Sequence, residues 1–411
     1  MDVPVTFAGK VARCYLPFAA GYFLSYAFRV VNGAIAPDMT RDLALDPAAL
    51  GAVTSAYFAA FAAAQLPLGV ALDRWGPRRV EAFLLVFAAV GALVFATAEG
   101  IAQLAVGRGL IGFGVAACLI AAIKANTLYW PIGRLPLANG TLLGFGGLGA
   151  ASATLPVELA LAAFGWRSVL GTMAALTLLI AATIWMAAPR ARPISTTGEG
   201  LAQQARGMAR VLVHRDFWRV APLTAVTHAV YLAYQSLWAG PWMRDVAGLD
   251  RLAVAEGLFL VTATMAVGYP IFGVIADRLA ARGISTRRAF AAFAALFLAA
   301  QVSIALGVPV SAHWLWAGFG FAGCGCILGY AVATQSFPPG LAGRVNAAVN
   351  VLTFALAFVT QWGIGWALAG FGAAQDVGHS RVLFALLAAQ ILCWIWLVLP
   401  RGRRPGLAPG G

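Results

Sequence analysis

The sequence predicts an all-helical membrane protein, and its composition and its hydropathy both support this class. Of the 411 residues, 61% are hydrophobic and only 10% are charged, and the mean hydropathy is +0.83. Soluble domains are closer to half apolar and a quarter charged. The sequence lacks the period-2 alternation of apolar and polar residues that would indicate a β-barrel. We therefore expect the chain to cross the bilayer as α-helices.

Twelve apolar stretches are long enough to be membrane spans. A helix needs about 20 mostly apolar residues to cross ~30 Å of hydrocarbon. The stretches lie at 14–36, 48–72, 79–98, 101–126, 137–160, 168–188, 217–241, 252–276, 287–307, 312–335, 342–369 and 380–400. The first is longer than a signal-peptide core and no small-residue cleavage site follows it, so we interpret it as a retained helix.

The positive charge of the chain indicates its topology. The formal net charge is +13, and most Lys and Arg fall in the segments on one side of the predicted spans. The segments on the other side hold five arginines: Arg41, Arg167, Arg244, Arg251 and Arg381. By the positive-inside rule, the chain is a multi-pass protein of the cell (inner) membrane with both termini in the cytoplasm. The cations then face anionic lipid headgroups, and we expect no nucleic-acid partner.

The cysteines predict neither a disulfide framework nor a metal site. All five lie in or at the edge of spans, away from outer loops where an oxidising compartment would pair them. Cys324 and Cys326 are two residues apart on one helix, so their side chains point in different directions and are poorly placed to share a metal. We therefore expect no cofactor.

The sequence repeats itself. A shift of 204 residues places Pro37 on Pro241 and Asp73 on Asp277. This predicts two pseudo-symmetric six-helix halves, residues 1–188 and 217–411, the second ending in a short basic cytoplasmic tail. The only long polar connection, 189–216, is interpreted as a cytoplasmic linker between them.

A short charged loop carries the family resemblance. The stretch GVALDRWGPRR, between the second and third spans, is similar to a signature of the major facilitator superfamily, although Pro77 stands where that pattern usually has a basic residue. Its matching residues are Gly69, Asp73, Arg74, Gly76, Arg78 and Arg79. A degenerate copy between spans 8 and 9 retains Gly273, Asp277 and Arg278.

The resemblance implies a twelve-helix transporter that works by alternating access. It also implies that Asp73, Arg74 and Asp277 make contacts that bias the equilibrium between inward-open and outward-open states. The alternative is that these charges only anchor a tight turn at the membrane surface.

Helices 1, 4, 7 and 10 line the central cavity in this family, and helix 1 has one polar face. A charge deep in a span is costly and normally faces water, a partner or a substrate. We predict that Arg29 contacts substrate, with a structural partner as the alternative. The helix 1 candidates, spaced by three and four, are Tyr22, Tyr26, Arg29 and Asn32.

Helix 7 presents a matching polar face. His228 is the group on this face that can titrate near neutral pH, so it is also a candidate for coupling. The alternative is that this histidine is a hydrogen-bonded packing residue. The substrate-binding candidates on helix 7 are His228, Tyr231, Gln235 and Trp238.

Helix 4 carries two cations that cannot both face the cavity. Arg108 and Lys124 are sixteen residues apart, which places them about 160° apart around the helix axis. We expect Arg108 to be structural or coupling, and Lys124 either to snorkel toward the cytoplasm or to reach the cavity.

The acidic residues lie in loops or near span ends, as Glu81, Glu158 and Glu256 do. A cavity with Arg29 and no central carboxylate suits an anion. We therefore predict a monomeric secondary transporter for a small organic anion or zwitterion, and not an enzyme.

Other cargoes remain open: dipeptides, nitrate or nitrite, and copper. Glycines on helix 5 are similar to those of nitrate and nitrite porters, but those porters use arginines on helices 2 and 8, where this chain has none. Copper would need His228 with Met243 or Met265. A non-transporting sensor or a membrane enzyme has little support, since the sequence has no hydrolase elbow, HExxH or phosphate loop.

Overall fold

The computed structural model describes residues 9, 11–189, 201–372 and 374–400, which contain helices and no strand. Nine helices in this described part are long and apolar enough to cross a membrane. The other three predicted spans, 14–36, 137–160 and 217–241, are also helical but fall short of that criterion. The two terminal segments and linker residues 190–200, which entered the topology argument, lie outside the described residues.

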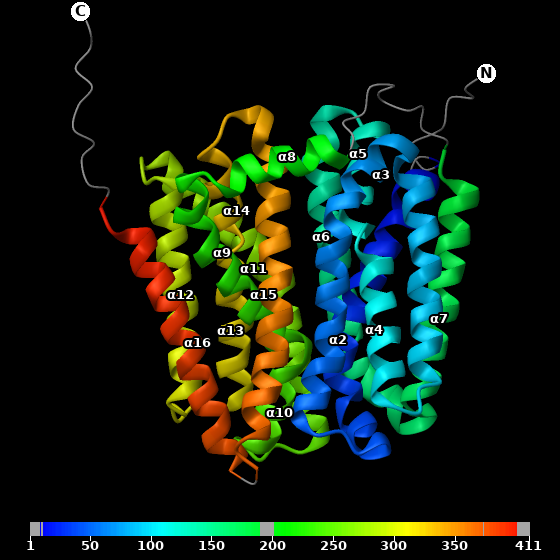
Figure 1. Ribbon diagram of the computed structural model, residues 1–411, viewed down its shortest axis with the longest axis vertical. Helices are drawn as coiled ribbons and strands as arrows, with labels where there is room; N and C mark the ends of the chain where they lie inside the picture. The colour runs from blue at the N-terminus through cyan, green and yellow to red at the C-terminus, as the bar shows by residue number, and fades with distance from the viewer. Residues whose placement is uncertain (1–8, 10, 190–200, 373, 401–411) are drawn as a thin grey trace, which may run out of the picture.

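The N-terminal bundle lies on the right of Figure 1. It comprises a π-helical turn (Val11–Tyr15), α2 (Leu16–Leu43), α3 (Pro47–Ala96), α4 (Ile101–Val115), α5 (Cys118–Tyr129), a 3-10 turn (Ile132–Arg134), α6 (Leu135–Ser152) and α7 (Leu155–Ala187). Both α3 and α7 contain a sharp reversal, because Gly76 and Gly165 adopt φ values of 76° and 71°. Glycine reaches this left-handed region without steric cost, so each of these helices holds two arms.

The C-terminal bundle lies on the left of Figure 1, and α8 (Leu201–Leu212) crosses one end of the molecule. This end is called the linker end below, and the opposite one the far end. The C-terminal bundle comprises α9 (Arg215–Ala233), a π-helical turn (Tyr234–Trp238), α10 (Ala239–Asp245), α11 (Arg251–Ala281), α12 (Thr286–Ala305), α13 (Ala312–Gly325), α14 (Leu328–Gln335), a 3-10 turn (Pro339–Leu341), α15 (Ala342–Ala369) and α16 (Gln375–Val398).

Helix caps repeat between the bundles. Asp46 caps α3 by accepting from the amide of Ala49 at 2.7 Å, and Asp250 caps α11 by accepting from the amide of Ala253 at 2.9 Å. The two aspartates are separated by the 204-residue shift found in the sequence. An N-cap aspartate satisfies a backbone donor that the helix leaves unpaired, so equivalent helices begin in the same way in both bundles.

Two glycines allow helices to approach at backbone distance. A Cβ on Gly112 of α4 would lie 2.2 Å from the carbonyl oxygen of Tyr57, and a Cβ on Gly149 of α6 would lie 2.1 Å from that of Phe23. Gly149 is one of the glycines of helix 5, and its lack of a side chain lets α6 pack closely against α2. A Cβ on Gly144, in contrast, would meet no atom within 4 Å. Between the bundles, α3 contacts α15 and α6 contacts α11. In addition, α2 contacts the π-helical turn Tyr234–Trp238.

Candidate functional site

Arg29 lies in the middle of α2 and is 6% exposed. Its guanidinium lies 4.4 Å from the ring centroid of Tyr26, and 5.5 and 5.6 Å from those of Phe61 and Phe354. No described carboxylate forms an ion pair with it, and its Nε has no hydrogen-bond partner among the described residues. Its charge interactions are instead with tyrosine hydroxyls, first that of Tyr57. Aromatic faces hold a cation without neutralising it, so the charge remains available to an anion.

Arg108 fixes the backbone that carries Arg29. The Arg108 side chain is 1% exposed, and it donates from Nη1 to the carbonyl of Phe28 at 2.7 Å and from Nη2 to the carbonyl of Arg29 at 3.3 Å. Its guanidinium also lies 4.9 Å from the ring centroid of Tyr57. The structural role expected for Arg108 therefore has a physical basis, since these bonds tie α4 to α2 at the level of the buried cation.

The C-terminal bundle brings a polar cluster to the same level. His228 of α9 is half-buried, and its Nδ1 lies 3.5 Å from the hydroxyl of Tyr330 on α14. That hydroxyl is also within 3.1 Å of Oδ1 of Asn350 and 3.2 Å of Oγ1 of Thr353. His228 is close enough to Arg29 for their charges to interact. Two residues predicted from different helices thus lie within electrostatic range of one another.

Contacts between α3 and α15 close the interface beside this cluster. The amide of Asn350 donates to Oε1 of Gln65 at 3.1 Å, and the rings of Phe61 and Phe354 pack with centroids 4.1 Å apart. Sequence reasoning did not assign Tyr330 or Asn350 to the site. Tyr330 could have been found as a polar residue on helix 10, one of the cavity-lining helices.

Several predicted binding residues are engaged in helix packing. Asn32 donates to Oγ1 of Thr54 at 2.8 Å, and Trp238 donates from Nε1 to the carbonyl of Gln361 at 3.1 Å. Gln235 donates to the hydroxyl of Tyr231 at 3.2 Å. Asn32, Tyr231, Gln235 and Trp238 are all buried. Tyr22 is buried as well and packs edge-on against Tyr26, with ring centroids 5.2 Å apart.

The charged loop joins helices within the N-terminal bundle. Asp73 forms an ion pair with Lys124 of α5, so Lys124 points to the linker end and not toward Arg29. Arg78 donates from Nε to the carbonyl of Trp185 on α7 at 2.8 Å, and Arg74 lies 5.7 Å from the ring centroid of Trp75. These contacts connect the reversal in α3 to α5 and α7.

The degenerate copy of the loop has a more open environment. Asp277 and Arg278 are exposed at the end of α11, and a Cβ on Gly273 would meet no atom within 4 Å. The reversal that follows uses Gly283, with a φ of 77°, as the counterpart of Gly76. The state-biasing role assigned to both copies remains a prediction.

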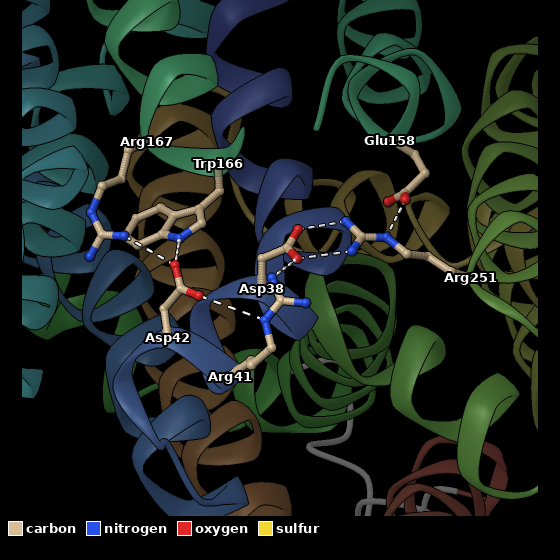
Figure 2. Close-up of polar contacts among 7 residues, drawn as sticks. All are labelled: Asp38, Arg41, Asp42, Glu158, Trp166, Arg167 and Arg251. Carbon is tan, nitrogen blue, oxygen red and sulfur yellow. Dashed lines mark hydrogen bonds and ion pairs between the residues drawn. The ribbon is translucent and has the colours of Figure 1, made fainter. Parts of the chain in front are cut away.

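An ion-pair network joins the two bundles at the far end (Figure 2). Arg251 of α11 donates to both carboxylate oxygens of Asp38 on α2, at 2.9 and 2.5 Å, and also pairs with Glu158 of α7. Hydrogen bonds from Arg251 hold the pKa of the Asp38 carboxyl below its ordinary value. Arg41 adds a second bond to Asp38 at 2.9 Å. One arginine therefore connects two helices of the opposite bundle.

A second set of contacts braces this network from within the N-terminal bundle. Asp42 accepts from Nε1 of Trp166 at 2.9 Å and from Nη1 of Arg167 at 3.1 Å (Figure 2). Sequence reasoning counted Arg167 and Arg251 only as outer cations. Their partners could not be found from spacing, because they come from distant parts of the chain.

A cavity of about 630 Å³ opens beside the network, between the far ends of the two bundles. Its wall includes Thr40, Asp46, Trp238, Arg244 and His379. Ligand cavities of small molecules fall in the range of about 300–1,000 Å³. The far end thus has a cavity large enough for a small solute, with Arg251 in its wall.

A family model of the Major Facilitator Superfamily matches residues 18–361. The chain belongs to the major facilitator superfamily. It is therefore a multi-pass membrane transporter.

Curated relatives of this family member include anion transporters. A probable sulfoacetate transporter of Cupriavidus necator is 28% identical over 309 residues, covering 71% of this chain and 70% of the relative. A nitrate/nitrite transporter of Picosynechococcus sp. is 32% identical over 146 residues, covering 36% of this chain and 27% of the relative. A probable nitrate/nitrite antiporter of Thermus thermophilus is 27% identical, covering 54% of this chain and 51% of the relative.

Solved structures of superfamily members share the fold. A bacterial homologue of the human lysosomal transporter Spinster, inward-facing and unoccupied, matches with a TM-score of 0.71 and 17% identity over 97% of each chain. A D-xylose–proton symporter matches with a TM-score of 0.69 and 13% identity, over 93% of this chain and 97% of the other. At these identities the likeness concerns the fold alone.

Proposed function

We propose that this protein carries a small organic anion across the cytoplasmic membrane by alternating access, with Arg29 as the anion anchor. The observation that carries the proposal is the charge state of the site: a buried guanidinium held by aromatic faces, with no described carboxylate paired to it. A carboxylate or sulfonate offers two or three oxygens to the planar fork of an arginine. The site is therefore complementary to an anionic group.

The opposite bundle supplies the groups that would hold the rest of the molecule. The polar cluster of His228, Tyr330 and Asn350 lies on α9, α14 and α15, and we expect it to face the anion held by Arg29. A bound anion would then contact both bundles at once, which is how a substrate favours one state of the transporter over the other. The relative from Cupriavidus necator supports sulfoacetate, which carries a carboxylate and a sulfonate, as the first compound to test.

The linker end is assigned to the cytoplasm by the distribution of Lys and Arg. In this orientation the Asp38–Arg251 network is the outer gate, and the Asp73–Lys124 pair lies on the cytoplasmic side. Of these two contacts, the Asp38–Arg251 network crosses between the bundles, whereas the Asp73–Lys124 pair lies within the N-terminal bundle.

Counterflow in proteoliposomes tests the proposed function. Purified protein is reconstituted with unlabelled sulfoacetate inside, and entry of labelled sulfoacetate is followed in the presence of competing nitrate, a dipeptide or Cu(I). We expect sulfoacetate exchange, and loss of exchange in Arg29→Ala, because the anion would enter a site with no compensating charge. The matched control is Arg210→Ala, which removes an exposed arginine of α8.

Two results would contradict the proposal. One is exchange of a labelled dipeptide or of labelled copper without any exchange of labelled sulfoacetate or nitrate. The other is wild-type exchange in Arg29→Ala, which would move the anion site away from α2. Strong competition by nitrate would keep the anion site and change the preferred cargo.

A further inference from the structure

A second buried charge-bearing group lies between Arg29 and the linker end. Glu81 is in the second arm of α3, a little more than one turn after Gly76, and is 0% exposed. Neither of its carboxyl oxygens has a hydrogen-bond partner among the described residues. The sequence predicted that Glu81 lies near a span end and gave no sign that it is enclosed.

The pocket around Glu81 is built from three other helices. A Cβ on Gly21 of α2 would lie 2.2 Å from Oε1 of Glu81, and Ile184 of α7 packs at the same place. The titratable group that interacts with the carboxyl is the thiol of Cys118, at the start of α5. No described cation pairs with Glu81. An enclosed carboxyl with no paired cation is costly as an anion, because it is desolvated without compensation, so its protonation state depends strongly on the charges near it.

Proton-bearing side chains connect this pocket to Arg29. The Cys118 thiol, which interacts with Glu81, also interacts with Tyr22 of α2. Tyr22 packs against Tyr26 with ring centroids 5.2 Å apart, and the guanidinium of Arg29 lies 4.4 Å from the Tyr26 ring centroid. Glu81 and Arg29 are thus connected through a short series of polar groups within one bundle.

We propose that Glu81 is the proton-binding site of this transporter, and that its protonation is linked to anion binding at Arg29. The inference rests on the proposed function and names its coupling ion. With the substrate site empty, the positive charge of Arg29 favours the carboxylate form of Glu81. An anion bound at Arg29 cancels that charge, so Glu81 then takes up a proton from the linker end. Linkage is reciprocal, so a protonated Glu81 raises the affinity for the anion by the same factor.

This scheme predicts transport of the anion together with a proton. The fully loaded transporter carries a neutral Glu81 and a neutralised Arg29, so neither buried group has an uncompensated charge while the bundles rearrange. It differs from coupling through His228, which would place the proton in the C-terminal bundle. Glu81→Gln and His228→Gln separate the two schemes.

The test combines exchange with a direct measurement of protons. Counterflow of labelled sulfoacetate at equal pH on both sides reports folding and substrate transport. Proton uptake is measured with a pH indicator when sulfoacetate is added to purified protein in weak buffer, and accumulation is measured with an inward proton gradient. We expect wild type to show all three activities. Glu81→Gln should retain counterflow and lose both proton uptake and gradient-driven accumulation, whereas Glu81→Asp should keep part of each.

The matched control is Glu256→Gln, which removes an exposed carboxylate of α11 and should behave as wild type. Should Glu81→Gln fail to fold, infrared difference spectra of the wild type on adding sulfoacetate give the same information. They should show the band of a carboxyl group that becomes protonated, and no such band would overturn the proposal.

Each failure has its own signature. Proton uptake or accumulation at the wild-type level in Glu81→Gln overturns the proton site and leaves the anion transporter intact. Loss of proton uptake in His228→Gln with counterflow retained overturns it as well. Absence of both sulfoacetate and nitrate counterflow in the wild type overturns the proposed function, and the coupling scheme with it.

Discussion

The Asp38–Arg251 pair is expected to hold the far ends of the two bundles together. Replacing Asp38 with Asn keeps the shape of the side chain and removes its charge, so Arg251 keeps only its pair with Glu158. The destabilised state is the one in which the far end is closed. Transport should then shift toward conformations that are open at this end.

The size of the effect follows from the geometry. Arg251 donates two charge-assisted hydrogen bonds to Asp38, each worth about 1.5–3 kcal/mol when well shielded. The Arg251 side chain is 42% exposed, so solvent screening lowers the value of the whole pair, and we take about 1–2 kcal/mol for it. At about 1.4 kcal/mol per factor of ten, this is a roughly 5- to 30-fold change in the ratio of closed to open far ends.

Cysteine accessibility measures this ratio. A cysteine at Thr40, in the wall of the far-end cavity, is labelled with a membrane-impermeant thiol reagent. Four of the five native cysteines are buried, which keeps the background low. We expect labelling to be roughly 5- to 30-fold faster in Asp38→Asn, in line with the estimate above, and unchanged in the control Glu99→Gln, an exposed carboxylate at the same end.

A double-mutant cycle with Arg251→Gln isolates the pair from its neighbours. The labelling effects of the two single variants should not add, because each removes the same interaction. Full additivity, or an Asp38→Asn labelling rate equal to wild type, would refute the reasoning that this pair closes the far end.

The same pair has a defined pH dependence. Because hydrogen bonds from Arg251 lower the pKa of Asp38 in the closed state, the stabilisation is fully present above the ordinary aspartate value of about 3.9. It is lost only as the pH falls through the lowered pKa. Labelling at Thr40 should therefore be constant from pH 5 to 8 and rise only in stronger acid. A rise between pH 5 and 7 would place another titrating group in the gate.

Three further predictions follow from named contacts. Asp73→Asn breaks the ion pair at the linker end, so it should slow transport and speed labelling of cysteines near that end. Asp277→Asn removes an exposed charge and should have a smaller effect. Equal effects of the two variants would argue against a specific role of the first loop. His228→Gln keeps a hydrogen-bonding side chain beside Tyr330, so it should weaken sulfoacetate binding by a few-fold and leave proton uptake intact, and an unchanged Kd would remove it from the binding site. Gly149→Ala places a Cβ 2.1 Å from the carbonyl oxygen of Phe23 and should lower the free energy of unfolding by about 1–3 kcal/mol. The control Gly144→Ala should be tolerated, because its Cβ would meet no atom within 4 Å. Similar melting temperatures of the two variants would refute the close approach of α6 and α2.

The fold could be predicted from the sequence because its signals are local. Span length, the Asp46 and Asp250 caps and the turn glycine Gly76 each act over a few residues. The depth of Arg29 also follows from its place in an apolar run, so its burial could be predicted. The state-biasing role of the charged loop and the boundaries of the halves remain predictions.

The partners of buried charges could not be predicted, because they come from distant segments. Asp38 meets Arg251 across 213 positions of sequence. Lys124 pairs with Asp73, although helical periodicity alone allowed it to face the cavity. Glu81 fits against α2 because Gly21 has no side chain at the point of contact. Such contacts depend on how helices cross, which periodicity along a single helix does not determine.

The equilibrium affinity of the purified protein for sulfoacetate, compared with that of its Arg29→Lys variant, tests the central claim most directly. Lysine keeps the positive charge but lacks the planar fork, so binding should weaken by about 1–3 kcal/mol, or roughly 5- to 150-fold in Kd. The Arg210→Lys control should bind as wild type. An Arg29→Lys variant that folds and binds sulfoacetate with the wild-type Kd would contradict the claim that Arg29 holds the anion.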